Sequence, residues 1–159
     1  MAYTERLNEQ LAIVGTIDPD AYAAIPAATA VTVATDIVDM RYAHRVMFVV
    51  LAGTIGAAGT IDFAIQQGTN ATTATTAIVP ACAITTMVTG DSDEQVVVEV
   101  EGQDLTPGYR YVRGLMTLSA TAGTAAIDVG AIVLADTSRY KAARDTIPDL
   151  ASVSEFVNA

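Results

Sequence analysis

The chain has 159 residues, which is enough for one domain with a buried core. Its net charge of −10 opposes a phosphate backbone, so nucleic acid is excluded as the main partner. The longest apolar run, Val46 to Ala52, is far shorter than the roughly 20 residues of a transmembrane helix, so no membrane partner is expected. The polar start MAYTERLNEQ lacks a signal-peptide pattern.

Residues 1–24 are predicted to form an N-terminal arm ahead of the main domain. Thr4 is a candidate N-cap of a short helix, which Gly15 would end. The sequence Asp18-Pro19-Asp20 is typical of a turn. The helix would place three apolar side chains on one side: Leu7, Leu11 and Val14.

Residues 25–136 carry the strand patterns and are predicted to form one β-sandwich or jelly-roll-like domain. Val, Ile and Thr are abundant, and they suit a pleated surface, so the expected fold class is all-β. The continuous apolar run Val46 to Ala52 predicts a strand buried on both faces. Alternation of Ile61, Phe63 and Ile65 with other residues predicts a half-buried strand. Further strands are predicted over 82–88, 96–101, 109–118 and 125–135, with a turn at Thr106-Pro107-Gly108 and an exposed Thr/Ala-rich loop over 68–77.

Residues 137–159 are predicted to form a C-terminal arm, with Asp149 capping a short helix. Burying each large apolar side chain is worth on the order of 1.5–3 kcal/mol, so spaced apolar residues in both arms predict docking on a partner. The alternative, that both ends fold back on their own sandwich, stays open. The predicted partner-binding residues are Leu7, Leu11 and Val14 in the first arm, and Arg139, Tyr140, Lys141, Arg144, Leu150, Val153 and Phe156 in the second.

The one histidine and the one cysteine are the residues that could carry chemistry. His44 with Arg41 and Arg45 could bind an anion, but the simpler interpretation is ordinary hydrogen bonding at the start of a strand. Cys82 and His44 could form a nucleophile and base, whereas a free cysteine in an apolar strand is usually a small buried hydrophobe. One cysteine allows no internal disulfide.

Two further groups have a functional and a structural interpretation. The carboxylates of Asp91, Asp93 and Glu94 could bind calcium weakly, but they lack a full ligand loop and are interpreted as a solvated turn. The side chains of Tyr109, Tyr111 and Arg113 could stack on a sugar, although such a row is more often sheet packing. No motif predicts catalysis, so the chain is expected to be no enzyme and to need no cofactor and no metal.

The chain resembles the small capsid decoration, or cement, proteins of tailed bacteriophages. Six segments carry this resemblance, and none is a catalytic motif, so its specificity lies in their order. They are LNEQLAIVGTIDPDA near the start, the pattern D-M-x-x-x-H-R-V-M over 39–47, IDFAIQQGT over 61–69, QVVVEVEGQDL over 95–105, GYRYVR over 108–113 and DVGAIVLADTSRY over 128–140.

The resemblance implies a β-sandwich that oligomerises, commonly as a homotrimer. It implies a place on the outer surface of the virion's capsid, where the protein bridges subunits of the major capsid protein at threefold or quasi-threefold positions. Two alternatives stay open: a tail or head–tail joining structural protein, and a sugar-binding β-sandwich module.

Overall fold

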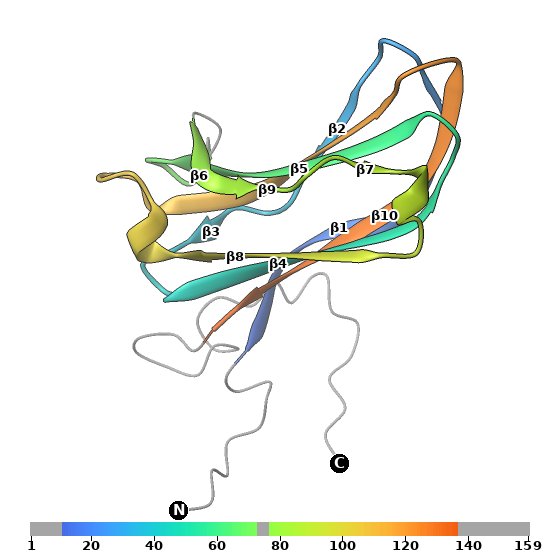
Figure 1. The fold of residues 1–159 in the computed structure, drawn as a ribbon. Coiled ribbons are helices and arrows are strands. Elements are labelled where there is room, and N and C mark those ends of the chain that lie inside the picture. Colours follow the sequence, from blue (N-terminus) through green and yellow to red (C-terminus); the bar gives the residue numbers. More distant parts are fainter. Residues whose placement is uncertain (1–10, 73–76, 137–159) are drawn as a thin grey trace, which may run out of the picture.

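The computed structural model describes residues 11–72 and 77–136, which form an all-β sandwich of two antiparallel sheets (Figure 1). The predicted fold class is therefore confirmed. Sheet A contains, in spatial order, β1 (Ala12–Pro26), β10 (Thr124–Ala135), β4 (Arg45–Ile55) and β8 (Gln95–Glu101). Sheet B contains β2 (Val31–Ala34), β9 (Tyr111–Ala120), β5 (Gly59–Gly68) and β6 (Ala77–Ala83) in order, while β3 (Val38–Asp39) pairs with β9 and β7 (Met87–Val88) pairs with β5. Two single 3₁₀ turns, η1 (Thr89–Asp91) and η2 (Gly102–Asp104), flank β8.

The core lies between the two sheets, where alternate side chains of each strand meet. Ile61, Phe63 and Ile65 of β5 are all buried, so the predicted half-buried strand is confirmed. Phe63 packs against Phe48 of β4 with ring centroids 5.9 Å apart, which joins sheet B to sheet A. Gly114 of β9 leaves the space that these two rings occupy, because a Cβ there would lie 2.4 Å from Phe63 Cζ.

Strand β4 is buried on one face only, so the prediction that Val46 to Ala52 is buried on both faces is wrong. Val46, Phe48 and Val50 point into the core and are fully buried, whereas the alternate residues Met47 and Val49 are only half-buried. Both sets are apolar, so the alternation between buried and half-buried side chains cannot be recognised from the sequence of this run. The outer face of sheet A is in this way lined with apolar side chains.

Residues 12–24 belong to the sandwich, so the predicted boundary at residue 25 is wrong for this part of the chain. They lie in β1, which pairs with β10 from Ala12↔Ala135 to Pro26↔Thr124. The pairing shifts register between Ile17 and Asp20, so the predicted turn at Asp18-Pro19-Asp20 is an irregularity within a strand. Gly130 faces that irregularity, and a Cβ there would lie 3.0 Å from the Cα of Pro19.

The remaining strand predictions are close to the structure. The predicted strand over 82–88 is divided between the end of β6 and the two-residue β7. The turn at Thr106-Pro107-Gly108 is confirmed, because Tyr109 N donates to Thr106 O at 2.9 Å and Gly108 has φ +93°. Within the predicted Thr/Ala-rich loop, residues 69–72 are exposed.

Candidate partner-binding surface

Both ends of the described chain leave the sandwich side by side. Ala12 at the start of β1 is the register partner of Ala135 at the end of β10. The segments before residue 11 and after residue 136 therefore begin at the same end of sheet A. We call this the exit end of the sandwich.

Asp136, at the exit end, forms hydrogen bonds with the loop that leads into β4. Its Oδ1 accepts hydrogen bonds from the backbone N–H groups of His44, at 2.8 Å, and Arg45, at 3.1 Å. Its Oδ2 lies 3.5 Å from Arg45 Nε, and its own N–H donates to Arg45 O at 3.1 Å. The start of β4 and the end of β10 are thus held in one arrangement by a single carboxylate.

A small apolar depression opens beside Leu11, on the outer face of sheet A. It has a volume of about 210 Å³, with Met47 and Leu134 among its lining residues. Arg45, Glu99 and Asp136 also line it, so charged groups surround an apolar floor. Leu11, one of the predicted partner-binding residues, is half-buried there.

The apolar lining continues across the outer face of sheet A as a cross-strand row. Val97 of β8 pairs with Val49 of β4, which pairs with Ile132 of β10. Val97 is 57% exposed and Ile132 is 36% exposed, which is unusual for large aliphatic side chains in the middle of strands. We call the depression and this row the outer apolar face. Its residues are Leu11, Met47, Val49, Val97, Ile132 and Leu134.

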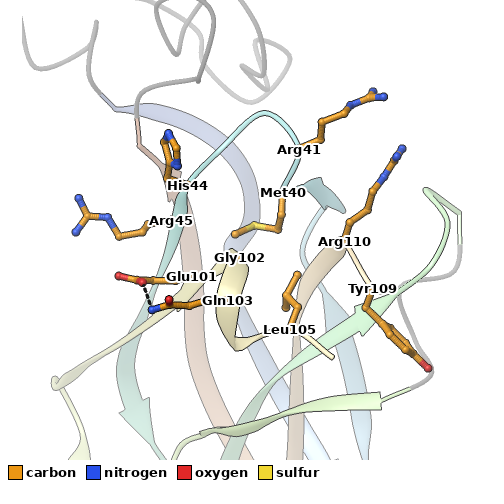
Figure 2. A pocket seen from close by; sticks show the side chains of 10 residues that line it. All are labelled: Met40, Arg41, His44, Arg45, Glu101, Gly102, Gln103, Leu105, Tyr109 and Arg110. Atoms are coloured by element: carbon orange, nitrogen blue, oxygen red, sulfur yellow. Dashed lines mark hydrogen bonds between the residues drawn. The ribbon is translucent and has the colours of Figure 1, made fainter. Parts of the chain in front are cut away.

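A basic pocket adjoins the exit end, around the loop between β3 and β4. Figure 2 shows its lining, which includes Met40, Arg41, His44, Arg45 and Arg110 and encloses about 390 Å³. The part of the chain that the structure describes contains four arginines and no lysine, and three of the four line this pocket. Glu101 lines it too, and Asp39, Glu99 and Asp136 lie within 4 Å of these arginines, so the pocket gathers most of the described arginines together with paired carboxylates.

The arginines of the pocket are positioned by acidic and aromatic neighbours. Asp39 Oδ2 lies 3.2 Å from Arg110 Nη2 and 3.5 Å from Arg41 Nη2, so one carboxylate holds both guanidinium groups. Each guanidinium also lies over a tyrosine ring, Arg41 over Tyr42 at 4.4 Å and Arg110 over Tyr111 at 4.6 Å. The hydrogen bond to the Tyr111 hydroxyl, and the nearby charge of Asp39, raise the pKa of Arg110. Figure 2 shows Arg41 and Arg110 extending in the same direction, and both remain about half exposed.

The structure confirms the predicted grouping of Arg41, His44 and Arg45, which line one pocket. It also supports the simpler interpretation of this segment, because the backbone N–H groups of His44 and Arg45 make hydrogen bonds at the start of β4. Arg110 and Asp136, which lie far from residue 44 along the chain, were not predicted to join this segment. Only the tertiary fold brings them to the same end.

Among the predicted arm residues, Val14 is placed differently from the prediction. It lies in β1, is 6% exposed and belongs to the core, so it cannot contact a partner in the folded domain. The helix predicted to carry it is absent over 11–26, where the chain is extended. Leu7 and all seven predicted residues of the C-terminal arm lie outside the described residues: Arg139, Tyr140, Lys141, Arg144, Leu150, Val153 and Phe156.

The nucleophile hypothesis for Cys82 and His44 finds no support in the geometry. Cys82 lines a groove between β6 and β8, whereas His44 lines the basic pocket. Burial, with a smaller contribution from the charge of Asp104, raises the pKa of the Cys82 thiol. A neutral thiol is a weak nucleophile, so the interpretation of Cys82 as a small hydrophobe fits better.

The acidic segment forms a turn, as its simpler interpretation predicted. Asp91 Oδ2 accepts the backbone N–H of Val88 at 2.8 Å, and Asp93 has φ +65°. Within 11–72 and 77–136, no three His, Cys, Asp or Glu side chains are grouped closely enough to hold a metal ion. In the same ranges no helix is long and apolar enough to cross a membrane.

The predicted aromatic row is not an exposed platform. Tyr109 precedes β9, so the three residues do not share one strand face. Tyr111 is only 9% exposed and is covered by the guanidinium of Arg110. Arg113 donates to Gln66 Oε1 at 3.0 Å. These contacts match sheet packing and leave little ring surface for a sugar.

Comparisons with known proteins add little to this geometry. No protein-family model matches the chain, and no curated protein matches it. Among solved structures, the chain is similar to one described as "Crystal structure of infectious bursal disease virus VP2 subviral particle". The identity is 10% and the TM-score is 0.31; the match covers 82% of this chain and 42% of that one. The chain thus spans less than half the length of this neighbour, and the similarity is too low to support an inference about function.

Proposed function

We propose that this protein is a non-enzymatic structural component of a virion. In this proposal it is a decoration protein that binds the outer surface of an assembled capsid and bridges subunits of the major capsid protein. The ordered sequence resemblance suggests the partner. The observation that carries the proposal is the exit end, where both terminal segments begin beside the basic pocket and the outer apolar face.

The chemistry of that end suits a protein partner better than a small molecule. The outer apolar face is shallow and spread over three strands. Another flat apolar surface would bury the largest part of its exposed apolar area, and that burial favours binding. The exposed guanidinium groups of Arg41 and Arg110 offer several N–H donors beside it, and they suit carboxylates on the partner. Acidic groups on the capsid surface are therefore the expected contacts.

The thermodynamics of a shell agree with this role. A ligand that binds the assembled lattice and not the free subunits shifts the equilibrium toward assembly. Many copies act at once, so each contact can be weak while the shell as a whole is stabilised. We further propose that the protein acts as a homotrimer, as the resemblance implies. Native mass spectrometry tests this, and a monomer at micromolar concentration would contradict a trimer that forms in solution.

The test is co-sedimentation of the purified protein with intact heads that lack it. Val49→Lys places a charge in the middle of the outer apolar face, and Thr117→Lys places the same charge in the middle of the outer face of sheet B. We expect at least a tenfold loss of affinity for Val49→Lys and little change for Thr117→Lys. Equal affinities would contradict the assignment of the surface, while failure of the unaltered chain to bind any head would contradict the function.

A second pair of variants tests the basic pocket. Arg110→Glu reverses a charge that lines it, whereas Arg113→Glu reverses the one described arginine that lies outside it. Binding to heads should weaken strongly for the first variant and should lose its dependence on salt concentration. If both variants bind with the same affinity and the same salt dependence, the pocket does not contact the capsid.

Truncations test the terminal segments. The structure limits the first cut, because residues 12–20 form the first half of β1 and their removal would open sheet A. Deletion of 1–10, and separately of 137–159, should therefore leave the strand content unchanged by circular dichroism while occupancy on heads falls. Unchanged occupancy after a deletion would mean that this segment makes no contact with the capsid.

A further inference from the structure

Strand β8 is an open edge of sheet A whose N-terminal half, QVVV, carries no charged residue. It runs QVVVEVE, and within the described part of the chain its only strand partner is β4. Exposed edges are commonly protected by charged side chains, proline or a bulge; β8 has no proline and no register shift, and its two charged residues, Glu99 and Glu101, lie toward its C-terminal end. Val97, at the middle of β8, is the most exposed large aliphatic side chain of the described residues.

The hydrogen bonds at the two ends of β8 show which backbone groups face away from the sheet. Ala52 N donates to Glu94 O at 3.0 Å, and Gly102 N donates to His44 O at 3.2 Å. Because such bonds alternate along an antiparallel ladder, the even-numbered residues of β8 bond to β4. The backbone groups of the odd-numbered residues therefore point outward. One of these four, Glu101, already donates its N–H to Asp104 Oδ2 at 2.8 Å, which leaves the N–H groups of Gln95, Val97 and Glu99.

These three outward groups define one register for pairing with a second copy. An antiparallel pair centred on Val97 uses the outward groups of Gln95, Val97 and Glu99, and does not require that of Glu101. A pair centred on Val98 would place Gln95 opposite Glu101, and would compete with the hydrogen bond to Asp104. The hydrogen bond of Glu101 thus favours the first of these two registers over the second.

The side chains suit the same register. Val97 would lie opposite its own symmetry mate, and Gln95 would lie opposite Glu99, so that within residues 95–99 an amide meets a carboxylate and no like charges are paired. On the inner side, Val96 would lie opposite Val98. These two line a groove of about 550 Å³ that Cys82 and Ile84 complete, along the open side of the sandwich.

We propose that β8 is a twofold self-association surface, at which two copies pair antiparallel through Gln95, Val97 and Glu99 and join their A sheets. The contact is isologous, so each residue of the surface meets the same surface on the other copy. It packs Val97 beside its symmetry mate and satisfies the outward backbone groups together. A twofold contact of this kind differs from the heterologous contact that a threefold homotrimer requires, and it needs no capsid.

Disulfide trapping of the full chain tests the pairing. In a Cys82→Ser background, Val97→Cys would place two thiols on the twofold axis, where directly opposed residues have Cα atoms about 5.5 Å apart, within the range of a disulfide. Ile132→Cys is the control, because it lies on the same outer face and is also exposed, but in a central strand. In a glutathione redox buffer, we expect Val97→Cys to yield disulfide-linked pairs at least tenfold faster than Ile132→Cys. Equal rates would overturn the proposal.

A charge-swap experiment separates self-pairing from occupation of the edge by another segment. Val97→Lys and Val97→Glu should each lower the association measured by sedimentation, because like charges would meet on the axis. An equimolar mixture of the two should restore association, since lysine would then face glutamate. A mixture that associates no better than either variant alone would overturn the proposal. Both assays are done without heads, so their failure would leave the proposed capsid binding untouched.

Discussion

The substitution Gly114→Ala should destabilise the sandwich through one identifiable contact. The added Cβ would lie 2.4 Å from Phe63 Cζ, 2.8 Å from Phe63 Cε2 and 3.2 Å from Phe48 Cδ1. Carbon atoms pack best at about 3.5–4.0 Å, so the Phe63 ring must move by roughly 1 Å. That ring is 1% exposed and packs against Phe48 with centroids 5.9 Å apart, so its movement disturbs a buried contact of the core.

The magnitude follows from three contributions. Overpacking a core costs about 1–3 kcal/mol, and disturbing an aromatic pair costs about 0.5–1.5 kcal/mol. Replacing glycine by alanine also lowers the entropy of the unfolded chain, which returns about 0.4–1 kcal/mol. The expected net loss is about 2 kcal/mol, or a decrease in Tm of roughly 4–8 °C for a domain of this size.

The assay is equilibrium unfolding in urea, followed by circular dichroism. Gly90→Ala is the control, since a Cβ there meets nothing within 4 Å, and its stability should stay within about 0.5 kcal/mol of the unaltered chain. Adding Phe63→Leu to Gly114→Ala should cost less than Phe63→Leu alone, because the methyl group fills space that the smaller side chain vacates. A Gly114→Ala protein as stable as the control, or strictly additive double-variant energies, would refute this account of the core.

Three further predictions concern polar groups of the described residues. Gln67 is 1% exposed and bonds Thr106 through both ends of its amide at 2.9 Å, so Gln67→Leu should cost about 1–3 kcal/mol in urea unfolding. Asp136→Ala removes the acceptor of two backbone N–H groups at the exit end and should cost about 1 kcal/mol in the same assay. Because the pKa of Cys82 is raised, its reaction with iodoacetamide should rise with pH at a higher midpoint in the folded protein than in urea. The contribution of this thiol to the free energy of unfolding is fully present below the pKa of the unfolded thiol, and it is lost as pH rises through the folded pKa. Equal midpoints in the two states would contradict the burial of this thiol.

The sequence predicted those elements whose alternation is visible locally. Ile61, Phe63 and Ile65 alternate with smaller or polar residues, and the structure buries all three. The turn before Tyr109 was predictable because Pro followed by Gly suits a positive φ at the second position. In these cases the residues that decide the conformation are neighbours in the chain.

The first strand could not be predicted because its stabilising contacts come from the other end of the chain. Asp18-Pro19-Asp20 disfavours a regular strand, and only pairing with β10, with Gly130 making room for Pro19, keeps this segment extended. The basic pocket has the same origin. Arg110 reaches Asp39 across the pairing of β3 with β9, and Asp136 reaches His44 from the end of β10. Neither contact leaves a pattern in the local sequence.

The most direct test of the proposed virion role is a three-dimensional reconstruction of phage particles assembled in the presence of this protein. The account predicts density for the sandwich on the outside of the head, at threefold or quasi-threefold positions, with the exit end and the outer apolar face of sheet A turned toward the shell. Density for the sandwich only in the tail or at the head–tail joint, or particles that lack the protein altogether, would contradict the account.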